Sequence, residues 1–429
     1  MLFKNIDIID ESFAVRRNVF LGVKEDRIAY IGTELPPEDY GETVCGKGRL
    51  LMPAFVNAHA HSPMSLMRGY GENLSLQDWL FTRIFPFEAK LTGDAVYWST
   101  LLTAAESLKY GIVATSDMYF FCEDIARAVA ESGTKVNVSH AVSKEDGVAF
   151  EDMNSIKATR RMARALHGAE NGRIRIDASL HAEYTSDEET ATKVADLAAE
   201  LGLNMHVHVS ETKTEHEECK TRHQGRTPVR YLADCGLFNT PAIAAHCVWV
   251  EDEDREILRE KGVTVASNPV SNLKLASGIC DVKALQDCGI NVALGTDSVA
   301  SNNNLSMFEE MKTMLLLAKV KHMDPTVISP RQALMMATLN GAKAQGRMDC
   351  GILKVGNKAD LIMLRTDTPN MNPVHDLLHN VVLSATDSDL VMTMADGKVL
   401  YENGEYKTID LERAIFEVER SVKDILARI

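Results

Sequence analysis

Two histidines stand two residues apart at the end of an apolar run, in the stretch LMPAFVNAHAHSP (51–63). Alternate residues of a β-strand point to the same side, so the rings of His59 and His61 would share one space. Imidazole nitrogens are common ligands of Zn²⁺. Alone, the pair fits two solvated side chains as well as a metal site, so the remaining ligands must come from elsewhere in the chain.

Single polar residues end other apolar runs. His181, His208, His246 and Asp297 stand at or just past the ends of the runs in ASLHAEY, HVHVSET, AIAAHCVW and VALGTDS. A catalytic zinc usually takes three or four protein ligands and keeps a position for water. If the run ends meet in space, the first histidine pair, one histidine of residues 203–211 and the aspartate would supply such a set.

Residues 203–211 offer two histidines for this role. His208 lies three residues before Glu211, close to the end of the run, whereas His206 lies deeper. The spacing favours His208 as the metal ligand and His206 as a packed or hydrogen-bonded core histidine. Asp297 is expected to be functional, because a buried carboxylate without a partner is costly.

These residues belong to a repeated alternation of apolar runs and helix-type segments. Eight runs lie at 53–61, 112–119, 135–142, 173–184, 203–211, 242–249, 263–272 and 292–298. Segments such as DEETATKVADLAAELG (187–202), with an acidic first turn and a glycine stop, separate them. Eight strand–helix units predict an α/β fold of the (β/α)8 TIM-barrel type. A doubly wound sheet fits the alternation too, but polar run ends favour the barrel, whose active sites gather at the C-terminal strand ends.

The sequence at the two ends of the chain predicts β-structure without the alternating helices. Short β-type segments fill the first fifty residues, and they return in GILKVGNKADLIMLR (351–365) and LVMTMADGKVLYENGEY (390–406). We therefore predict one small β-sandwich built from both termini. The expected domains are 1–52, the N-terminal part of the sandwich; 53–348, the catalytic barrel; and 349–429, the C-terminal part of the sandwich and a terminal helix.

Composition limits the partners. The chain of 429 residues carries a net charge of −15, which argues against nucleic acid and anionic membranes. No apolar run reaches the roughly 18 residues of a transmembrane helix, and the N-terminus does not resemble a secretory signal. Eight cysteines without a CxxC pair indicate reduced thiols. We expect a cytoplasmic protein that acts on a small molecule.

Five motifs, in chain order, resemble those of one known family. PAFVNAHAH, HVHVSET, AHCVWV, NPVSNLKLASG and LGTDS are similar to motifs of the amidohydrolase superfamily, and most of all to its methylthioadenosine/S-adenosylhomocysteine deaminases. The similarity runs through nearly the whole chain, and SLQDWLFTRIFPFEAKL (75–91) points more narrowly to the nucleoside branch. No lysine is a good candidate for carboxylation, so the resemblance implies one metal per subunit.

The resemblance implies a role for each candidate residue. One Zn²⁺ per subunit, with Fe²⁺ or Mn²⁺ as alternatives, would be bound by His59, His61, His208 and Asp297. Catalysis would fall to Glu211 as proton shuttle, His246 beside the attacking water, and Asp297. Substrate contacts would come from Trp79, Glu88 on the ribose, His181 on the base, Glu211 and Asp297. A homo-oligomer, dimer or tetramer, is the family expectation.

These residue types suit hydrolytic deamination of adenine. A bound metal brings the pKa of water to about 7. Asp297 or His246 can take the proton of the water that attacks C6, and Glu211 can protonate ring nitrogen N1. Ammonia leaves after a second proton transfer. A carboxylate such as Glu88 can accept both hydroxyl groups of a vicinal diol.

One segment departs from the family pattern. Relatives that accept S-adenosylhomocysteine carry arginines after strand three, which suit its carboxylate. This chain has His140 and Ala149 in the comparable stretch VSHAVSKEDGVAFEDMN (138–154), with Lys144 and Arg160 as nearby cations. The departure favours 5′-deoxyadenosine, methylthioadenosine and adenosine over S-adenosylhomocysteine.

We therefore predict a metal-dependent hydrolase that converts the 6-amino group of adenosine-type nucleosides to the inosine analogue and releases ammonia. An alternative in the same superfamily is a guanine- or triazine-type amidohydrolase or chlorohydrolase, in which Glu88 would have no diol to bind. A metal-free scaffold protein is a third interpretation, and the complete set of four metal ligands disfavours it.

Overall fold

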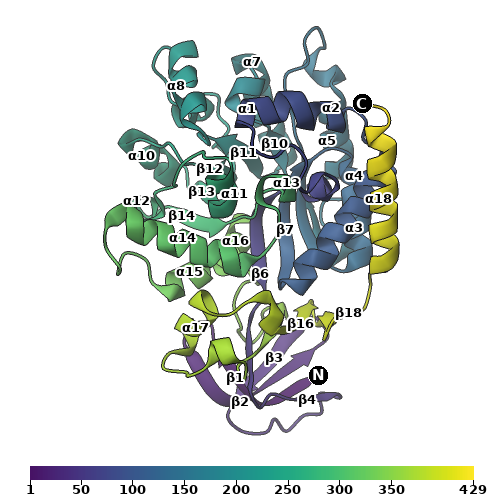
Figure 1. Ribbon diagram of the computed structural model, residues 1–429, viewed down its shortest axis with the longest axis vertical. Coiled ribbons are helices and arrows are strands. Elements are labelled where there is room, and N and C mark those ends of the chain that lie inside the picture. The colour runs from purple at the N-terminus through teal and green to yellow at the C-terminus, as the bar shows by residue number, and fades with distance from the viewer.

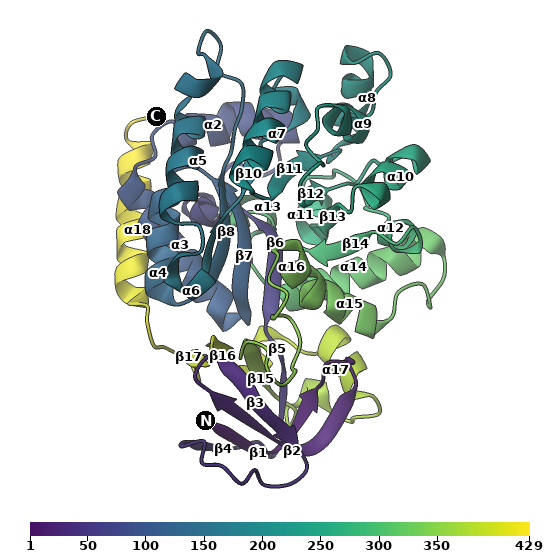
Figure 2. The same cartoon turned by 180° about the vertical axis from the view of Figure 1, so that it is seen from behind.

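Eight parallel strands, the fourth of them in two pieces, close into a barrel in the computed structural model, which describes residues 1–429 (Figures 1 and 2). One hydrogen-bonded arc has the order β6-β7-β8-β9, and the other has the order β10-β11-β12-β13-β14. The strands are β6 (Phe55–Ala60), β7 (Ile112–Tyr119), β8 (Lys135–His140), β9 (Ile174–Ile176), β10 (Ala178–Leu180), β11 (Met205–Val209), β12 (Ala242–His246), β13 (Thr264–Ser267) and β14 (Asn291–Leu294). They lie in the eight predicted runs, and the predicted TIM-barrel class is confirmed.

The fourth barrel strand is broken into β9 and β10 at Asp177. The N–H of Asp177 donates to the carbonyl of Val138 at 3.0 Å, so the two arcs stay joined across the break. At the other seam β14 lies against β6, and the N–H of Asp297 donates to the carbonyl of His59 at 3.0 Å. This seam brings the ends of the first and last strands together.

Helices cover the outside of the barrel. The longer ones are α3 (Gly93–Lys109), α4 (Cys122–Ser132), α5 (Asn154–Ala165), α7 (Glu188–Leu201), α8 (Lys213–Arg222), α9 (Pro228–Asp234), α10 (Asp252–Glu260), α14 (Met307–His322) and α15 (Pro330–Ala337). In α7 the side chain of Asp187 accepts from the N–H of Thr190 at 2.9 Å, and Gly202 ends the helix with φ 65°. Asp187 is a favourable N-cap residue, and Gly202 is the glycine stop that the sequence pattern predicts. No helix combines the length and apolar character needed to cross a membrane.

Short elements occupy the loops and connections. They are η1 (Ser62–Met67), α1 (Leu76–Trp79), η2 (Leu80–Ile84), α2 (Phe85–Glu88), η3 (Phe150–Asp152), α6 (Ala169–Gly172), η4 (Glu183–Thr185), α11 (Pro269–Lys274), α12 (Val282–Asp287), α13 (Val299–Asn302), α16 (Leu339–Ala344), η5 (Pro369–Met371), α17 (Leu377–Leu383) and η6 (Asp387–Asp389). The segment from α1 through the π-helical η2 to α2 comes after the first barrel strand and covers the C-terminal end of the barrel.

Strands from both ends of the chain form one further sheet at the base of the barrel (Figures 1 and 2). It contains β1 (Leu2–Ile9), β2 (Val15–Lys24), β3 (Arg27–Gly32), β4 (Thr43–Cys45), β5 (Arg49–Pro53), β15 (Leu361–Arg365), β16 (Leu390–Ala395), β17 (Lys398–Glu402) and β18 (Glu405–Tyr406). The order is β18-β17-β16-β15-β5-β1-β2-β3, with β4 beside β1.

Hydrogen bonds join the strands of this terminal unit, the predicted small β-sandwich, along one continuous path. Antiparallel pairing of β5 with β15, in which Met52 faces Ile362, joins the N-terminal and C-terminal halves. A core of 15 buried residues, with members from both halves, packs in this unit. The shared origin in both termini is as predicted; the domain bounds 1–52, 53–348 and 349–429 remain a proposal.

The last helix leaves this sheet and returns to the barrel. Helix α18 (Leu411–Leu426) runs along α3 (Figure 1). The guanidinium of Arg413 lies 4.9 Å from the ring centre of Trp98, and Arg420 lies 3.4 Å from Asp94. The C-terminal segment therefore ties the terminal sheet to the outer layer of the barrel.

Candidate functional site

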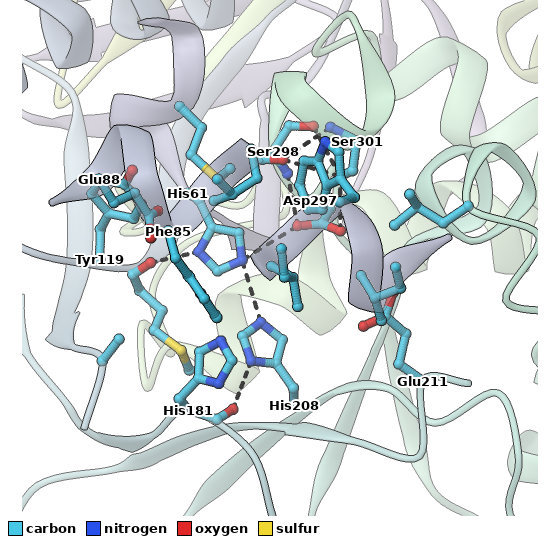
Figure 3. A pocket seen from close by; sticks show the side chains of 18 of the residues that line it. His61, Phe85, Glu88, Tyr119, His181, His208, Glu211, Asp297, Ser298 and Ser301 are labelled. Atoms are coloured by element: carbon cyan, nitrogen blue, oxygen red, sulfur yellow. Dashed lines mark hydrogen bonds and ion pairs between the residues drawn. The ribbon is translucent and has the colours of Figure 1, made fainter. Parts of the chain in front are cut away.

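The polar residues predicted to share a site come together at the C-terminal end of the barrel (Figure 3). His59 is the last residue but one of β6 and His61 follows the strand. His208 lies near the end of β11, His246 ends β12, and Asp297 follows β14. Positive φ angles at Ser210, His246 and Asp297, of 48°, 73° and 57°, mark the chain turns at three of these strand ends. Such angles are costly for residues with side chains and are concentrated at functional sites.

The imidazoles of His59, His61 and His208 turn their Nε2 atoms toward one another and toward Asp297. The ligand atoms of His59, His61 and His208 all lie within 4.8 Å of one another. Oδ1 of Asp297 lies 3.3 Å from Nε2 of His61 and 3.6 Å from Nε2 of His59. Nε2 of His59 is buried without a hydrogen-bond partner. This donor set, with one orphaned buried nitrogen, fits a divalent metal with nitrogen and oxygen ligands.

The other ring nitrogens are fixed by hydrogen bonds. Nδ1 of His61 donates to the carbonyl of Met118 at 2.5 Å, and Nδ1 of His208 donates to the carbonyl of His181 at 2.6 Å. Because a carbonyl only accepts, each ring proton sits on Nδ1 and the lone pair is on Nε2. Second bonds of this kind orient metal ligands and set their tautomer.

His206 supplies the matching contact for His59. Its Nε2 lies 2.9 Å from Nδ1 of His59, and the side chain is buried. His206 is thus a buried, hydrogen-bonded histidine, whereas His208 lines the cavity; the choice of His208 as the metal ligand stays a prediction. Burial lowers the pKa of His59 to about 3, so this ring is neutral, as a metal ligand must be.

Asp297 is held by three donors. The N–H of Ser298 binds Oδ1 at 2.7 Å, while the hydroxyls of Ser271 and Ser301 bind Oδ2 at 2.6 and 3.1 Å. Burial by itself would raise the pKa of Asp297, but the contact with His59 and the nearby imidazoles hold it well below the usual range. The carboxylate is therefore charged. The two serines were not foreseen from the sequence, because nothing in their spacing reveals the contact.

His246 is oriented by two asparagines. Its Nδ1 faces the amide nitrogens of Asn272 at 2.9 Å and Asn268 at 3.2 Å. With Nδ1 accepting, the ring proton sits on Nε2, which lies 3.8 Å from Oε2 of Glu211. His246 is also within ligand reach of His59 and Asp297. It can donate a hydrogen bond into the site beside the metal position.

Glu211 lies just past β11 and is 7% exposed. The hydroxyl of Ser277 donates to its Oε1 at 3.4 Å. Burial, and next the charge of Asp297, raise the pKa of Glu211 to about 8. The carboxyl group therefore keeps its proton near neutral pH, as a group that must donate a proton requires.

These residues lie around one open cavity, lined by apolar side chains and a few convergent polar groups, as small-molecule sites are. Trp79, Glu88 and His181 line it together with His61, Glu211 and Asp297, so every predicted substrate contact lies on this cavity. In Figure 3, Glu88 and Glu211 lie on opposite sides of the histidines. Burial raises the pKa of Glu88 to about 7, against the opposing effect of its contact with Tyr119.

The cavity contains no lysine or arginine among its 22 lining residues. Lys144 instead pairs with Asp146 at 3.3 Å and Asp187 at 3.2 Å. Arg160 pairs with Glu151 at 3.0 Å and Glu200 at 2.7 Å. Neither of the two cations near the departing segment therefore replaces an arginine inside the cavity.

His140 and Ala149 also lie outside the cavity lining. His140 packs edge-on against Phe120, with ring centres 5.7 Å apart. Phe120 and Ala141, together with the uncharged Tyr119 and Ser143, line the cavity in this region, so the wall next to His140 offers no cation.

A second cluster of metal-type residues lies outside the cavity. Glu183, Cys219 and His223 have ligand atoms within 4.8 Å of one another. Both oxygens of Glu183 are already occupied, by Arg222 at 2.7 and 3.2 Å and by His223 at 2.6 Å. Arg222 supplies the positive charge that Glu183 needs, so this cluster is an ion-pair network.

Comparison with known proteins identifies the family of this chain and two similar deaminases. A model of the amidohydrolase family matches residues 50–400, and the chain belongs to this family. It is 42% identical over 428 residues to a 5-methylthioadenosine/S-adenosylhomocysteine deaminase of Dictyoglomus thermophilum, with 100% of this chain and 99% of the relative covered. It is 41% identical over 411 residues to a 5′-deoxyadenosine deaminase of Methanosarcina mazei, with 95% and 93% covered.

A solved structure shares the whole fold. The crystal structure of an adenosine deaminase from Xanthomonas campestris with bound zinc superposes with a TM-score of 0.92 and 29% identity, covering 99% of this chain and 98% of that one. The barrel, the terminal sheet and their arrangement are therefore common to the two proteins.

Proposed function

We propose that this protein is a metal-dependent deaminase that replaces the 6-amino group of adenosine-type nucleosides by oxygen and releases ammonia. The observation that carries the proposal is the cluster of ligand atoms of His59, His61 and His208, with the Asp297 carboxylate beside two of these rings, at the wall of one cavity. The protonated Glu211 lies on the same cavity wall. The deaminase proposal is also supported by relatives about 40% identical over nearly the full length, which are named as deaminases of adenosine-type nucleosides.

The metal that we propose is zinc, one ion per subunit, bound by His59, His61, His208 and Asp297. Zinc suits a set of three imidazoles and one carboxylate, and the related adenosine deaminase structure has bound zinc. Iron or manganese would satisfy the same ligands. When bound, the ion activates a water for attack at neutral pH.

The residues of the chain divide the proton transfers. Asp297 is a charged carboxylate and can accept a proton from the attacking water, whereas His246 presents an N–H and can hold that water by donation. Glu211 donates its proton to N1, which makes C6 of the ring a better electrophile. A second transfer then protonates the amino group, which leaves as ammonia.

Three residues bind the rest of the nucleoside. We assign Glu88, across the cavity from Glu211, to the ribose hydroxyls, because one carboxylate can accept two O–H groups. His181 contacts the base, and Trp79, which is 6% exposed, forms part of the wall. A guanine or triazine substrate has no diol, so this arrangement favours a nucleoside.

The preferred 5′ substituent is uncharged. A carboxylate on the substrate would find no lysine or arginine in the cavity, whose acidic residues are Glu88, Glu211 and Asp297. A hydrogen bond to a charged group contributes about 1.5–3 kcal/mol, which corresponds to about 10- to 150-fold in affinity. We therefore place 5′-deoxyadenosine, methylthioadenosine and adenosine ahead of S-adenosylhomocysteine.

A side-by-side assay of the zinc-loaded protein tests this proposal. The change of the adenine chromophore to hypoxanthine is followed for the four nucleosides, and kcat/KM is compared. We expect turnover of the three uncharged substrates and a kcat/KM at least about tenfold lower for S-adenosylhomocysteine. Equal use of S-adenosylhomocysteine would contradict the substrate preference, and no turnover of any nucleoside would contradict the deaminase.

We further propose a homo-oligomer, a dimer or tetramer, and a cytoplasmic location. The eight cysteines are all free of disulfide bonds, as is usual in a reducing compartment. Size-exclusion chromatography with light scattering would measure the assembly. A monomer would contradict the first part of this proposal.

A further inference from the structure

Glu215 is a buried carboxyl group that the proposed reaction does not use. It stands in the first turn of α8, four residues beyond Glu211, and is 2% exposed. Burying an ionisable group is costly unless its oxygens receive hydrogen bonds. The partners of this side chain therefore indicate its purpose.

Both oxygens of Glu215 bind the main chain of the loop that carries Glu211. Oε1 accepts from the N–H of Ser210 at 2.9 Å, and Oε2 accepts from the N–H of Glu211 at 2.7 Å. Ser210 has φ 48°, in the left-handed region that residues with a side chain rarely adopt. Consecutive N–H groups around such a residue form a concave site for an anion, and the Glu215 carboxylate fills it.

This contact differs from ordinary helix capping. In a capping box, the glutamate at N3 returns to the N–H of the N-cap residue, which in α8 is Thr212. Thr212 makes the usual N-cap contact, because its hydroxyl accepts from the N–H of Glu215 at 3.1 Å. The Glu215 carboxylate passes Thr212 and binds the two residues before it. It therefore stabilises the loop after β11 and not the N-cap itself.

That loop sets the direction of the Glu211 side chain. From this backbone Glu211 reaches the hydroxyl of Ser277 at 3.4 Å and Nε2 of His246 at 3.8 Å. Without Glu215, two N–H groups would lose their acceptors and the positive φ of Ser210 would lose its support. Displacing a reacting group by about 1 Å can cost about 100-fold in rate.

We propose that Glu215 is a positioning residue for the proton shuttle. Its carboxylate holds the N–H groups of Ser210 and Glu211 and thereby aims the Glu211 carboxyl at the ring nitrogen of the substrate. This inference rests on the proposed deaminase function and adds to it a residue that touches neither substrate nor metal.

A double-mutant cycle with Glu211 tests the proposal. Glu215→Gln keeps the size of the side chain but replaces one acceptor oxygen by an amide group that cannot accept. We expect kcat to fall about 10- to 100-fold, with KM and zinc content unchanged within about twofold. In a Glu211→Gln background the same change should cost less than about twofold, because no shuttle remains to be positioned. Glu217→Gln, on the exposed face of α8, is the matched control and should leave kcat unchanged.

Each outcome has a distinct meaning. An equal loss in both backgrounds, a loss of zinc, or no loss in Glu215→Gln would overturn the positioning role while leaving the deaminase function in place. Wild-type protein that deaminates no nucleoside would overturn the function and the inference together. If Glu215→Gln does not fold, Glu215→Asp, which keeps both oxygens on a shorter stem, enters the same cycle, and a smaller loss that disappears in the Glu211→Gln background is expected.

Discussion

Removing the hydrogen-bond partner of His59 is expected to weaken metal binding. When His59 binds a metal through Nε2, its ring proton must lie on Nδ1, which faces Nε2 of His206 at 2.9 Å. His206→Phe removes this acceptor in a space where both rings are fully buried. A buried donor left without a partner costs about 1–3 kcal/mol. The metal-free ring can move its proton to Nε2, so the cost falls on the metal-bound state.

We therefore expect the Zn²⁺ affinity of His206→Phe to be about 10- to 100-fold lower. Competition with a chromophoric chelator measures this affinity without relying on activity. His206→Gln, which offers an amide oxygen to Nδ1 of His59, should lose less. His167→Phe is the control, because His167 binds the backbone of Ile176 and does not line the cavity. An unchanged affinity in His206→Phe would refute the reasoning.

Three further predictions concern pH, substrate and stability. Burial and the charge of Asp297 raise the pKa of Glu211 to about 8, and only the protonated form can donate a proton. We therefore expect kcat/KM to fall as the pH rises through about 8. A kcat/KM that stays constant up to about pH 9.5 would contradict this role. Glu88→Gln should lower kcat/KM about 10- to 100-fold for adenosine but little for 2′,3′-dideoxyadenosine, which lacks both hydroxyl groups. Equal losses for the two substrates would contradict a contact between Glu88 and the ribose. Lys135, which is 3% exposed and pairs with Asp360 and with Asp396 at 2.8 Å, links the barrel to the terminal sheet. Lys135→Met should cost about 3–5 kcal/mol in urea unfolding, while Lys354→Met on the surface should cost little.

The barrel could be predicted because its strands carry a strong local signal. Strands of a parallel barrel are buried on both faces and appear as apolar runs, and their C-terminal ends carry the functional residues. Six polar residues at the run ends could be selected on this basis: His59, His61, His181, His208, His246 and Asp297. The choice of His208 over His206 also followed from position within one run, because the deeper residue of a strand packs in the interior.

The contacts that hold these residues could not be predicted. Ser271, Asn272 and Glu215 bind Asp297, His246 and Glu211 through folded geometry, and isolated polar residues have no periodicity that reveals a partner. The break of the fourth strand at Asp177 was not predicted, because no glycine or proline interrupts residues 173–184 and one charged residue does not mark a break. Likewise, alternating β segments do not show the order in which strands pair, since that depends on contacts between residues such as Met52 and Ile362, more than 300 positions apart.

The most direct test of the central claim is metal-dependent release of ammonia from 5′-deoxyadenosine. Metal-free protein, prepared with a chelator, is titrated with Zn²⁺, and ammonia and the change in ring absorbance are measured together. The account predicts no turnover without metal, activity that saturates at one Zn²⁺ per subunit, and no recovery in Asp297→Asn. Full activity of the metal-free protein, or an inactive protein that has bound one Zn²⁺ per subunit, would contradict it.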